Sequence, residues 1–174
     1  MLQGNALRHQ MVLPQQQKIY DYWRSQCKGG KLPTPYDIEP QFIKEHLPTV
    51  SLVELCQGED RRRYKFRLAG TGFWDLFNAE ITGRYIDNLP LGERADYWAR
   101  VYDRVIETGR PTAGLTRPGT PKGSHLAQFW IRMPLSTNGT DIDMVLGYDH
   151  LVKMSEVPSE DGADIVPIDT KLYA

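Results

Sequence analysis

Alternating apolar and charged side chains predict a two-faced strand over residues 61–69. Tyr64, Phe66 and Leu68 alternate with arginine and lysine, as in an antiparallel strand with one buried and one solvated face. A shorter apolar run at 52–56 precedes it across a glycine turn. Three more strands are expected at residues 112–117, 126–133 and 142–150, separated by Pro-Gly and Asn-Gly turns. The pattern therefore predicts five short strands paired as an antiparallel sheet.

In the last two strands we expect every second residue to point into the core. In the strand at 126–133 the inward residues are Ala127, Phe129, Ile131 and Met133, and Gln128, Trp130 and Arg132 lie on the other face. In the strand at 142–150 the inward residues are Ile142, Met144, Leu146 and Tyr148.

Helices are predicted before and between these strands. An apolar stripe over residues 93–108 predicts a long amphipathic helix that Gly109 ends. Two glycines break the strand at 61–69, and the aromatic residues that follow them predict a short helical turn at 73–78. A further helix at 15–27 precedes a proline-rich connector. The predicted class is α+β, a five-stranded antiparallel sheet with helices on one face, preceded by an N-terminal helix.

Length and composition are those of one globular domain with appendages. The chain has 174 residues, of which 40% are hydrophobic and 25% charged, enough for an ordinary core. The expected division is an N-terminal tail at 1–14, a helix and connector at 15–50, a domain at 51–152 and an acidic tail at 153–174. Within the acidic tail, Ile165 and Val166 could dock on the domain or on a partner.

Charge and cysteine content limit the partners. A formal net charge of −1 provides no overall attraction for nucleic acid or anionic lipid. The arginines at 61–67 are explained as the solvated face of a strand. Cys27 and Cys56 lack metal-binding spacing, and neither a signal peptide nor a run of roughly 20 apolar residues is present. We expect a cytoplasmic protein without nucleic-acid or membrane partners.

No catalytic or metal-binding constellation is visible. The four histidines, His9, His46, His125 and His150, have no neighbours at ligand spacing. Residues 119–124 have the composition of a phosphate loop but not its spacing, so a hairpin turn explains them. The sequence predicts that the chain is not an enzyme and holds no metal.

An ordered set of short motifs carries a family resemblance. The motifs are Tyr22-Trp23-Arg24, Gly29-Gly30-Lys31-Leu32-Pro33, Asp37-Ile38-Glu39-Pro40, Leu47-Pro48, Arg67-Leu68-Ala69-Gly70-Thr71, Leu76-Phe77 and Thr82-Gly83-Arg84. Together they cover residues 20–90, and the strand pattern extends the likeness to about residue 152. The chain resembles a family of small stand-alone PAS-like proteins, mostly from alphaproteobacteria. Pro35 departs from the arginine usual in that family, so no role of that arginine is transferred. The resemblance implies a PAS fold and a sensory or interaction class.

The resemblance also bears on cofactors, because PAS photosensors that bind flavin carry a cysteine on the helix after the second strand. Residues 73–78 contain no cysteine. Haem-binding members supply an axial histidine from the long helix, and residues 93–108 contain none. Both a cysteinyl-flavin photocycle and haem are therefore disfavoured, and the cofactor is left open.

An excess of aromatic residues predicts a ligand pocket between sheet and helices. The expected lining residues are Phe66, Leu68, Trp74, Phe77, Tyr85, Trp98, Tyr102, Phe129, Met144 and Leu146. The alternative is that these side chains fill the core and leave no cavity, because protein interiors pack densely.

Association is the other predicted activity. Ile19, Tyr22 and Trp23 form an apolar stripe that must be buried, and the resemblance implies burial across a partner's sheet in a homodimer. If the helix folds back on its own sheet, the protein can be monomeric. We therefore expect a regulatory module that senses a small molecule, associates with a protein, or both. A homodimeric scaffold with a filled core is the alternative, and a small α+β enzyme with an aromatic pocket is a second one.

Overall fold

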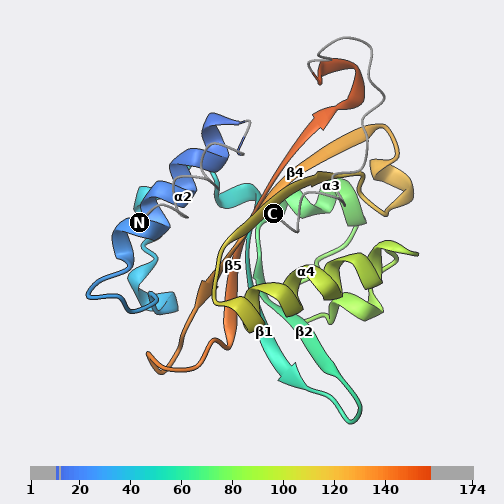
Figure 1. The fold of residues 1–174 in the computed structure, drawn as a ribbon. Coiled ribbons are helices and arrows are strands. Elements are labelled where there is room, and N and C mark those ends of the chain that lie inside the picture. The colour runs from blue at the N-terminus through green and yellow to red at the C-terminus, as the bar shows by residue number, and fades with distance from the viewer. Residues whose placement is uncertain (1–10, 12, 158–174) are drawn as a thin grey trace.

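The alternating segments form one five-stranded antiparallel sheet with the strand order β2-β1-β5-β4-β3 (Figure 1). The computed structural model describes residues 11 and 13–157. The strands are β1 (Val50–Gln57), β2 (Arg62–Ala69), β3 (Thr112–Thr116), β4 (Leu126–Leu135) and β5 (Met144–Lys153). The predicted α+β class is confirmed. Most of the predicted N-terminal tail, and the acidic tail from residue 158 with Ile165 and Val166, lie outside the described residues.

Helices cover both faces of the sheet. The long helix α4 (Arg94–Thr108) and the short α3 (Trp74–Phe77) lie on one face, and α2 (Pro14–Gln26) lies on the other (Figure 1). Short 3-10 turns occur at Pro35–Asp37, Pro40–Phe42, Leu47–Thr49, Thr71–Phe73, Ile86–Asn88, Pro121–Gly123 and Met154–Glu156.

The helix ends follow from local sequence. Pro14 stands in the first turn of α2, where a missing N–H costs nothing because that donor has no helical partner. Gly109 ends α4 in the left-handed conformation, with φ of 64°, and its N–H donates to the carbonyl of Val105 at 2.9 Å. The predicted helices at 15–27 and 93–108 are thus present to within one residue at each end.

Each face of the sheet has its own hydrophobic core. Tyr64 and Trp130 belong to the core beneath α4, whereas Ile131 and Met133 belong to the core beneath α2. β4 is therefore buried along both faces, and even Arg132 is only 4% exposed. This corrects the expectation that only one set of alternating residues points into a core. The physical reason is that α2 covers the face that a two-layer arrangement leaves open.

A β-bulge interrupts the alternation predicted for β2. Val53 pairs with Phe66, whereas the preceding Leu52 pairs with Leu68, so one extra residue is inserted at Arg67. Because directly opposed residues point to the same face, Leu68 lies on the α2 side and Phe66 on the α4 side. Leu68 is 46% exposed there. The prediction that Leu68 shares a face with Phe66 is wrong for this reason.

Candidate functional site

A buried ion pair joins the central strand β5 to its neighbour β4 on the α4 side. Arg132 of β4 lies opposite Gly147, and Asp149 of β5 lies opposite Trp130, so the two charged residues are diagonal neighbours on one face. Nη2 of Arg132 is 2.9 Å from Oδ1 and 3.0 Å from Oδ2 of Asp149. The two side chains are 4% and 0% exposed. A Cβ atom at Gly147 would lie 3.2 Å from Nη1 of Arg132, so glycine leaves room for the guanidinium.

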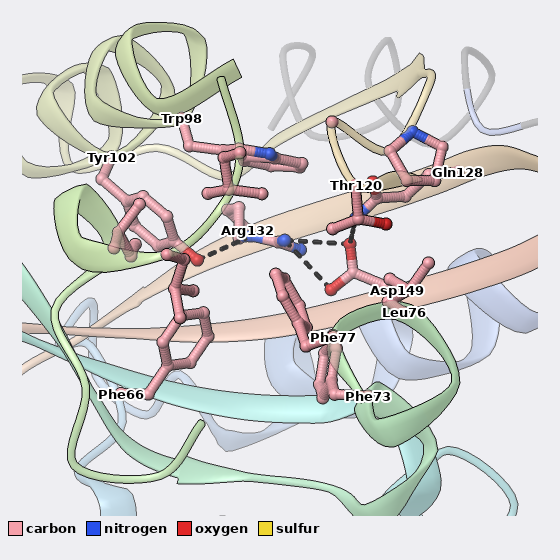
Figure 2. A pocket seen from close by; sticks show the side chains of 15 residues that line it. Phe66, Phe73, Leu76, Phe77, Trp98, Tyr102, Thr120, Gln128, Arg132 and Asp149 are labelled. Atoms are coloured by element: carbon pink, nitrogen blue, oxygen red, sulfur yellow. Dashed lines mark hydrogen bonds and ion pairs between the residues drawn. The ribbon is translucent and has the colours of Figure 1, made fainter. Parts of the chain in front are cut away.

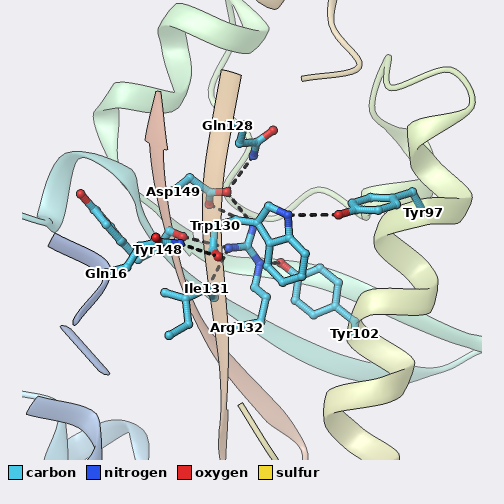
Figure 3. A network of polar contacts seen from close by, with 9 residues as sticks. All are labelled: Gln16, Tyr97, Tyr102, Gln128, Trp130, Ile131, Arg132, Tyr148 and Asp149. Carbon is cyan, nitrogen blue, oxygen red and sulfur yellow. Dashed lines mark hydrogen bonds and ion pairs between the residues drawn. The ribbon is translucent and has the colours of Figure 1, made fainter. Parts of the chain in front are cut away.

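All donor groups of the Arg132 guanidinium have partners. Nε donates to Oη of Tyr102 at 3.0 Å, and Nη1 donates to the carbonyls of Ile131 at 2.9 Å and Tyr148 at 3.1 Å (Figure 3). Nη2 donates to both oxygens of Asp149. These contacts use the five donor hydrogens of a guanidinium. The group is therefore held in a single orientation.

Electrostatics keep Arg132 and its partner Tyr102 in defined protonation states. Burial is the largest single effect on the pKa of Arg132 and would lower it, but the charges and hydrogen bonds of Asp149 and Tyr102 together outweigh burial, and the pKa lies above its ordinary value. Burial raises the pKa of the Tyr102 hydroxyl, and Arg132 opposes this only in part. Arg132 is thus charged and Tyr102 protonated at neutral pH.

Aromatic rings enclose the guanidinium. Its central carbon lies 4.6 Å from the ring centre of Trp98, 5.7 Å from that of Tyr102 and 5.8 Å from that of Trp130. These distances allow cation–π attraction, which is strongest away from water. Nε1 of Trp130 donates to Oη of Tyr97 at 3.1 Å, which fixes the indole against α4. The long helix thus supplies most of the surface that covers the charge.

A small cavity of about 30 Å³ lies beside the ion pair, between the sheet, α3 and α4 (Figure 2). Its lining consists of Phe66, Phe73, Leu76, Phe77, Ile86, Leu89, Leu91, Trp98, Tyr102, Pro118, Gly119, Thr120, Gln128, Arg132 and Asp149. That volume holds about one or two water molecules, far less than the roughly 300–1,000 Å³ of typical ligand pockets. One side is polar and the remainder aromatic or aliphatic.

Four predicted ligand residues line this cavity, namely Phe66, Phe77, Trp98 and Tyr102. They come from β2, α3 and α4, and the tertiary structure brings them together.

The other six predicted ligand residues lie elsewhere. Trp74 is 48% exposed, and Leu68 is turned away by the bulge. Tyr85 packs under the Arg63 guanidinium, whose carbon is 3.9 Å from the ring centre. The remaining three, Phe129, Met144 and Leu146, lie on the α2 side of the sheet. Apolar alternation predicts them as pocket residues because it cannot distinguish two buried faces of a strand.

Of the predicted association residues of α2, Ile19 and Trp23 pack against their own sheet, and Tyr22 contacts the connector. Ile19 and Trp23 are 0% and 5% exposed, and Nε1 of Trp23 donates to the carbonyl of Pro134 at 3.0 Å. Oη of Tyr22 accepts a hydrogen bond from the backbone N–H of Glu39 at 2.8 Å. This arrangement is the alternative in which the helix folds back on its own sheet, and it differs from burial against a partner.

Sequence reasoning missed the polar side of the cavity. Gln128, Arg132 and Asp149 were not among the predicted site residues, and neither was Thr120. A signal was available, because two opposite charges and an amide stand within the most apolar strands of the chain. Such residues are rarely buried without a partner, so their presence there marks a polar site.

A sheet of this topology, with a long helix across an internal cavity, defines the PAS class of folds. The sequence profile of the PAS domain family matches residues 11–149, so the chain belongs to this family. Membership supports a sensory module in general terms. No protein of curated function matches the chain.

Three similar solved structures are of VqmA. VqmA bound to DPO is 18% identical with a TM-score of 0.50, covering 63% of this chain and 55% of that one. The Vibrio cholerae VqmA dimer without target DNA is 17% identical with a TM-score of 0.53, covering 70% and 55%. The VqmA–ligand–DNA complex from Vibrio cholera is 19% identical with a TM-score of 0.50, covering 67% and 52%. The chain spans about half the length of these proteins, and the likeness shows the shared fold.

The described residues offer neither a membrane-spanning helix nor a cluster of metal ligands. Residues 11 and 13–157 contain no helix that is long and apolar enough to cross a bilayer. The same part of the chain contains no group of three or more histidine, cysteine, aspartate or glutamate residues that could hold a metal ion.

Proposed function

We propose that the chain is a cytoplasmic regulatory module that binds a small molecule beside the Arg132–Asp149 pair and signals through protein association. The observation that carries this proposal is a buried, fully hydrogen-bonded ion pair in the wall of an internal cavity. Removing two charges from water is costly, and apolar residues in their place are often as stabilising or more so. A charged pair at a cavity wall is therefore better explained by recognition than by stability.

Ligand entry requires the apolar wall to move. Phe73 and Phe77 stand against the cavity from a 3-10 turn and from the four-residue helix α3. Such short helical segments have little stability of their own, so their position depends on packing. A ligand that displaces these two rings from the ion pair would replace the packing contacts that the rings lose.

Helix α2 is the proposed output element. Its Gln16 side chain donates to the carbonyl of Trp130 (Figure 3). Its Trp23 side chain donates to the carbonyl of Pro134, so the two bonds lie on either side of Arg132 in β4. Tyr36 and Phe42 of the connector are 88% and 62% exposed and provide apolar surface near this helix. One of the similar structures is a VqmA dimer, so a homodimer is the association we propose for this chain.

No nucleic-acid partner is proposed for this chain. The similar VqmA was solved with DNA, but that protein is about twice as long as the part this chain matches. The net charge of −1 predicts no nucleic-acid partner, and this stays a prediction. A homodimeric scaffold without a ligand is the second candidate function, and the small volume of the cavity favours it.

Native mass spectrometry of the protein purified from cells tests the proposal. We expect a reproducible extra mass that is released on denaturation, and we expect the double variant Arg132→Met with Asp149→Leu to lack it. The matched control is Lys18→Gln with Glu45→Gln, which removes an exposed ion pair of 3.0 Å and should retain the mass. A dimer without extra mass would support the scaffold, and a bare monomer would contradict both functions.

A further inference from the structure

We infer that the cavity takes a small, flat, uncharged molecule that donates an N–H or O–H hydrogen bond to Asp149. The inference rests on the proposed binding function and adds the chemical class of the ligand. It follows from which hydrogen-bonding groups at the cavity wall are already used and which are left.

An anionic ligand does not fit the polar wall. Arg132 is the cation of the cavity lining, and its donor hydrogens already point to Tyr102, two carbonyls and Asp149. A carboxylate or phosphate would have to replace Asp149 as the partner of the guanidinium while lying beside that carboxylate. Two like charges at such a distance in a buried site repel strongly.

A cationic ligand does not fit either. The charge of Asp149 is balanced by Nη2 of Arg132 at 2.9 Å and 3.0 Å. A second cation at the carboxylate would lie close to the guanidinium, and the removal of its own hydration would not be compensated. The ligand is therefore uncharged.

The polar wall of the cavity contains hydrogen-bond acceptors that are not fully used. Oδ1 of Asp149 accepts from Nη2 of Arg132 and, at 2.7 Å, from Nε2 of Gln128, and Oδ2 accepts from Nη2 alone. A carboxylate offers about four lone-pair positions, so one is left at Oδ2. Oε1 of Gln128 receives no hydrogen bond from the described residues. A ligand that brings a donor hydrogen therefore completes the wall, whereas a ligand with acceptors alone meets mainly other acceptors.

The apolar walls set the shape. Figure 2 shows the rings of Trp98 and Phe77 on opposite sides of the ion pair, with Phe73 next to Phe77. The aromatic rings of the lining favour a flat ligand that stacks on a phenylalanine face. The cavity of about 30 Å³ admits such a ligand only if the phenylalanine rings shift, which limits its size to that of the displaced side chains.

Three matched probes test the class. Benzimidazole carries one N–H donor, 1-methylbenzimidazole lacks it, and benzoate is a flat anion of similar size. Each is titrated into the wild-type protein while the indole N–H signal of Trp98 is followed by ¹H–¹⁵N NMR. We expect benzimidazole to bind about tenfold or more tightly than its methylated form, the usual effect of a hydrogen bond to a charged group. Benzoate should bind more weakly than benzimidazole.

The Arg132→Met and Asp149→Leu double variant shows whether the preference arises at this pair. We expect it to bind both benzimidazoles equally. Equal binding by the wild type, tightest binding of benzoate, or an unchanged preference in the double variant would each overturn the inferred class. The mass carried by the purified wild-type protein is measured separately, so an anionic native ligand would overturn the class and leave the proposed binding function standing.

Discussion

The side-chain amide of Gln16 donates a hydrogen bond of 2.9 Å to the carbonyl of Trp130, which lies 114 residues further along the chain. Gln16 is 2% exposed, so water does not compete for this bond. Trp130 belongs to the strand that carries Arg132, whose side chain points to the opposite face of the sheet. The N-terminal helix and the cavity are therefore attached to the same strand from its two sides.

Replacement of Gln16 by alanine should loosen α2. The Trp130 carbonyl would lose a buried donor, and we expect the free energy of unfolding to fall by about 1–3 kcal/mol. Lys18→Ala is the control, because Lys18 forms an exposed ion pair with Glu45 and such pairs contribute about 1 kcal/mol or less. Urea unfolding measures both variants. Equal losses in the two variants would contradict a specific role for Gln16.

The ion pair should show strong coupling between its members. Arg132→Met leaves the Asp149 carboxylate buried without its partner, and we expect a loss of about 3–5 kcal/mol. Asp149→Leu should be similarly destabilising, whereas the double variant should be about as stable as the wild type. Chemical denaturation of all four proteins gives the coupling energy. If the double variant loses as much as the two single variants together, the coupling energy is zero, each side chain stabilises the fold independently, and the argument for recognition fails.

Substitution of two tryptophans distinguishes a residue of the cavity wall from a residue of the surface. Trp98 is 5% exposed and packs on Arg132, so Trp98→Ala should cost about 3–5 kcal/mol of stability. Trp74 is 48% exposed, and Trp74→Ala should cost about 1 kcal/mol or less. Thermal unfolding of both variants provides the comparison. A loss at Trp74 as large as that at Trp98 would show that Trp74 is part of the core after all.

Acid should weaken the fold through His150. Burial, and then the charge of nearby His46, lower the pKa of His150 in the folded chain from its ordinary 6.5. The unfolded chain therefore binds this proton at a higher pH than the folded one. The contribution is complete above pH 6.5 and is lost as the pH falls through and below that value.

Unfolding by urea at pH 7 and at pH 5.5 measures this effect. His150→Gln keeps a polar partner for Oη of Tyr148, which lies 3.1 Å from Nδ1 of His150. We expect the variant to lose less stability between the two pH values than the wild type does. An identical loss in both proteins would assign the acid sensitivity to other groups.

Local sequence predicted the elements well, because each depends on neighbouring residues. The stripe at 93–108 and Gly109 place α4, since a helix is specified by its periodicity and by the residue that ends it. The turn at Asn138 and Gly139 separates β4 from β5. The order of these elements was sufficient for the antiparallel PAS fold.

The composition of the candidate site was only partly predictable. Phe66, Phe77, Trp98 and Tyr102 follow from aromatic content and helix periodicity. Leu68 did not, because a bulge of one residue reverses which face a strand residue takes, and the sequence contains no mark of it.

By itself, the sequence determined that apolar and polar residues alternate along the strands, where the helices begin and end, and that many aromatic side chains need burial. Only the tertiary structure decided that α2 covers the second face of the sheet, that β4 is buried on both sides, and that Arg132 and Asp149 meet beneath α4. The reason is physical. Periodicity records the two faces of a strand, but the burial of each face, and the cost of a charge there, depend on elements packed from distant parts of the chain.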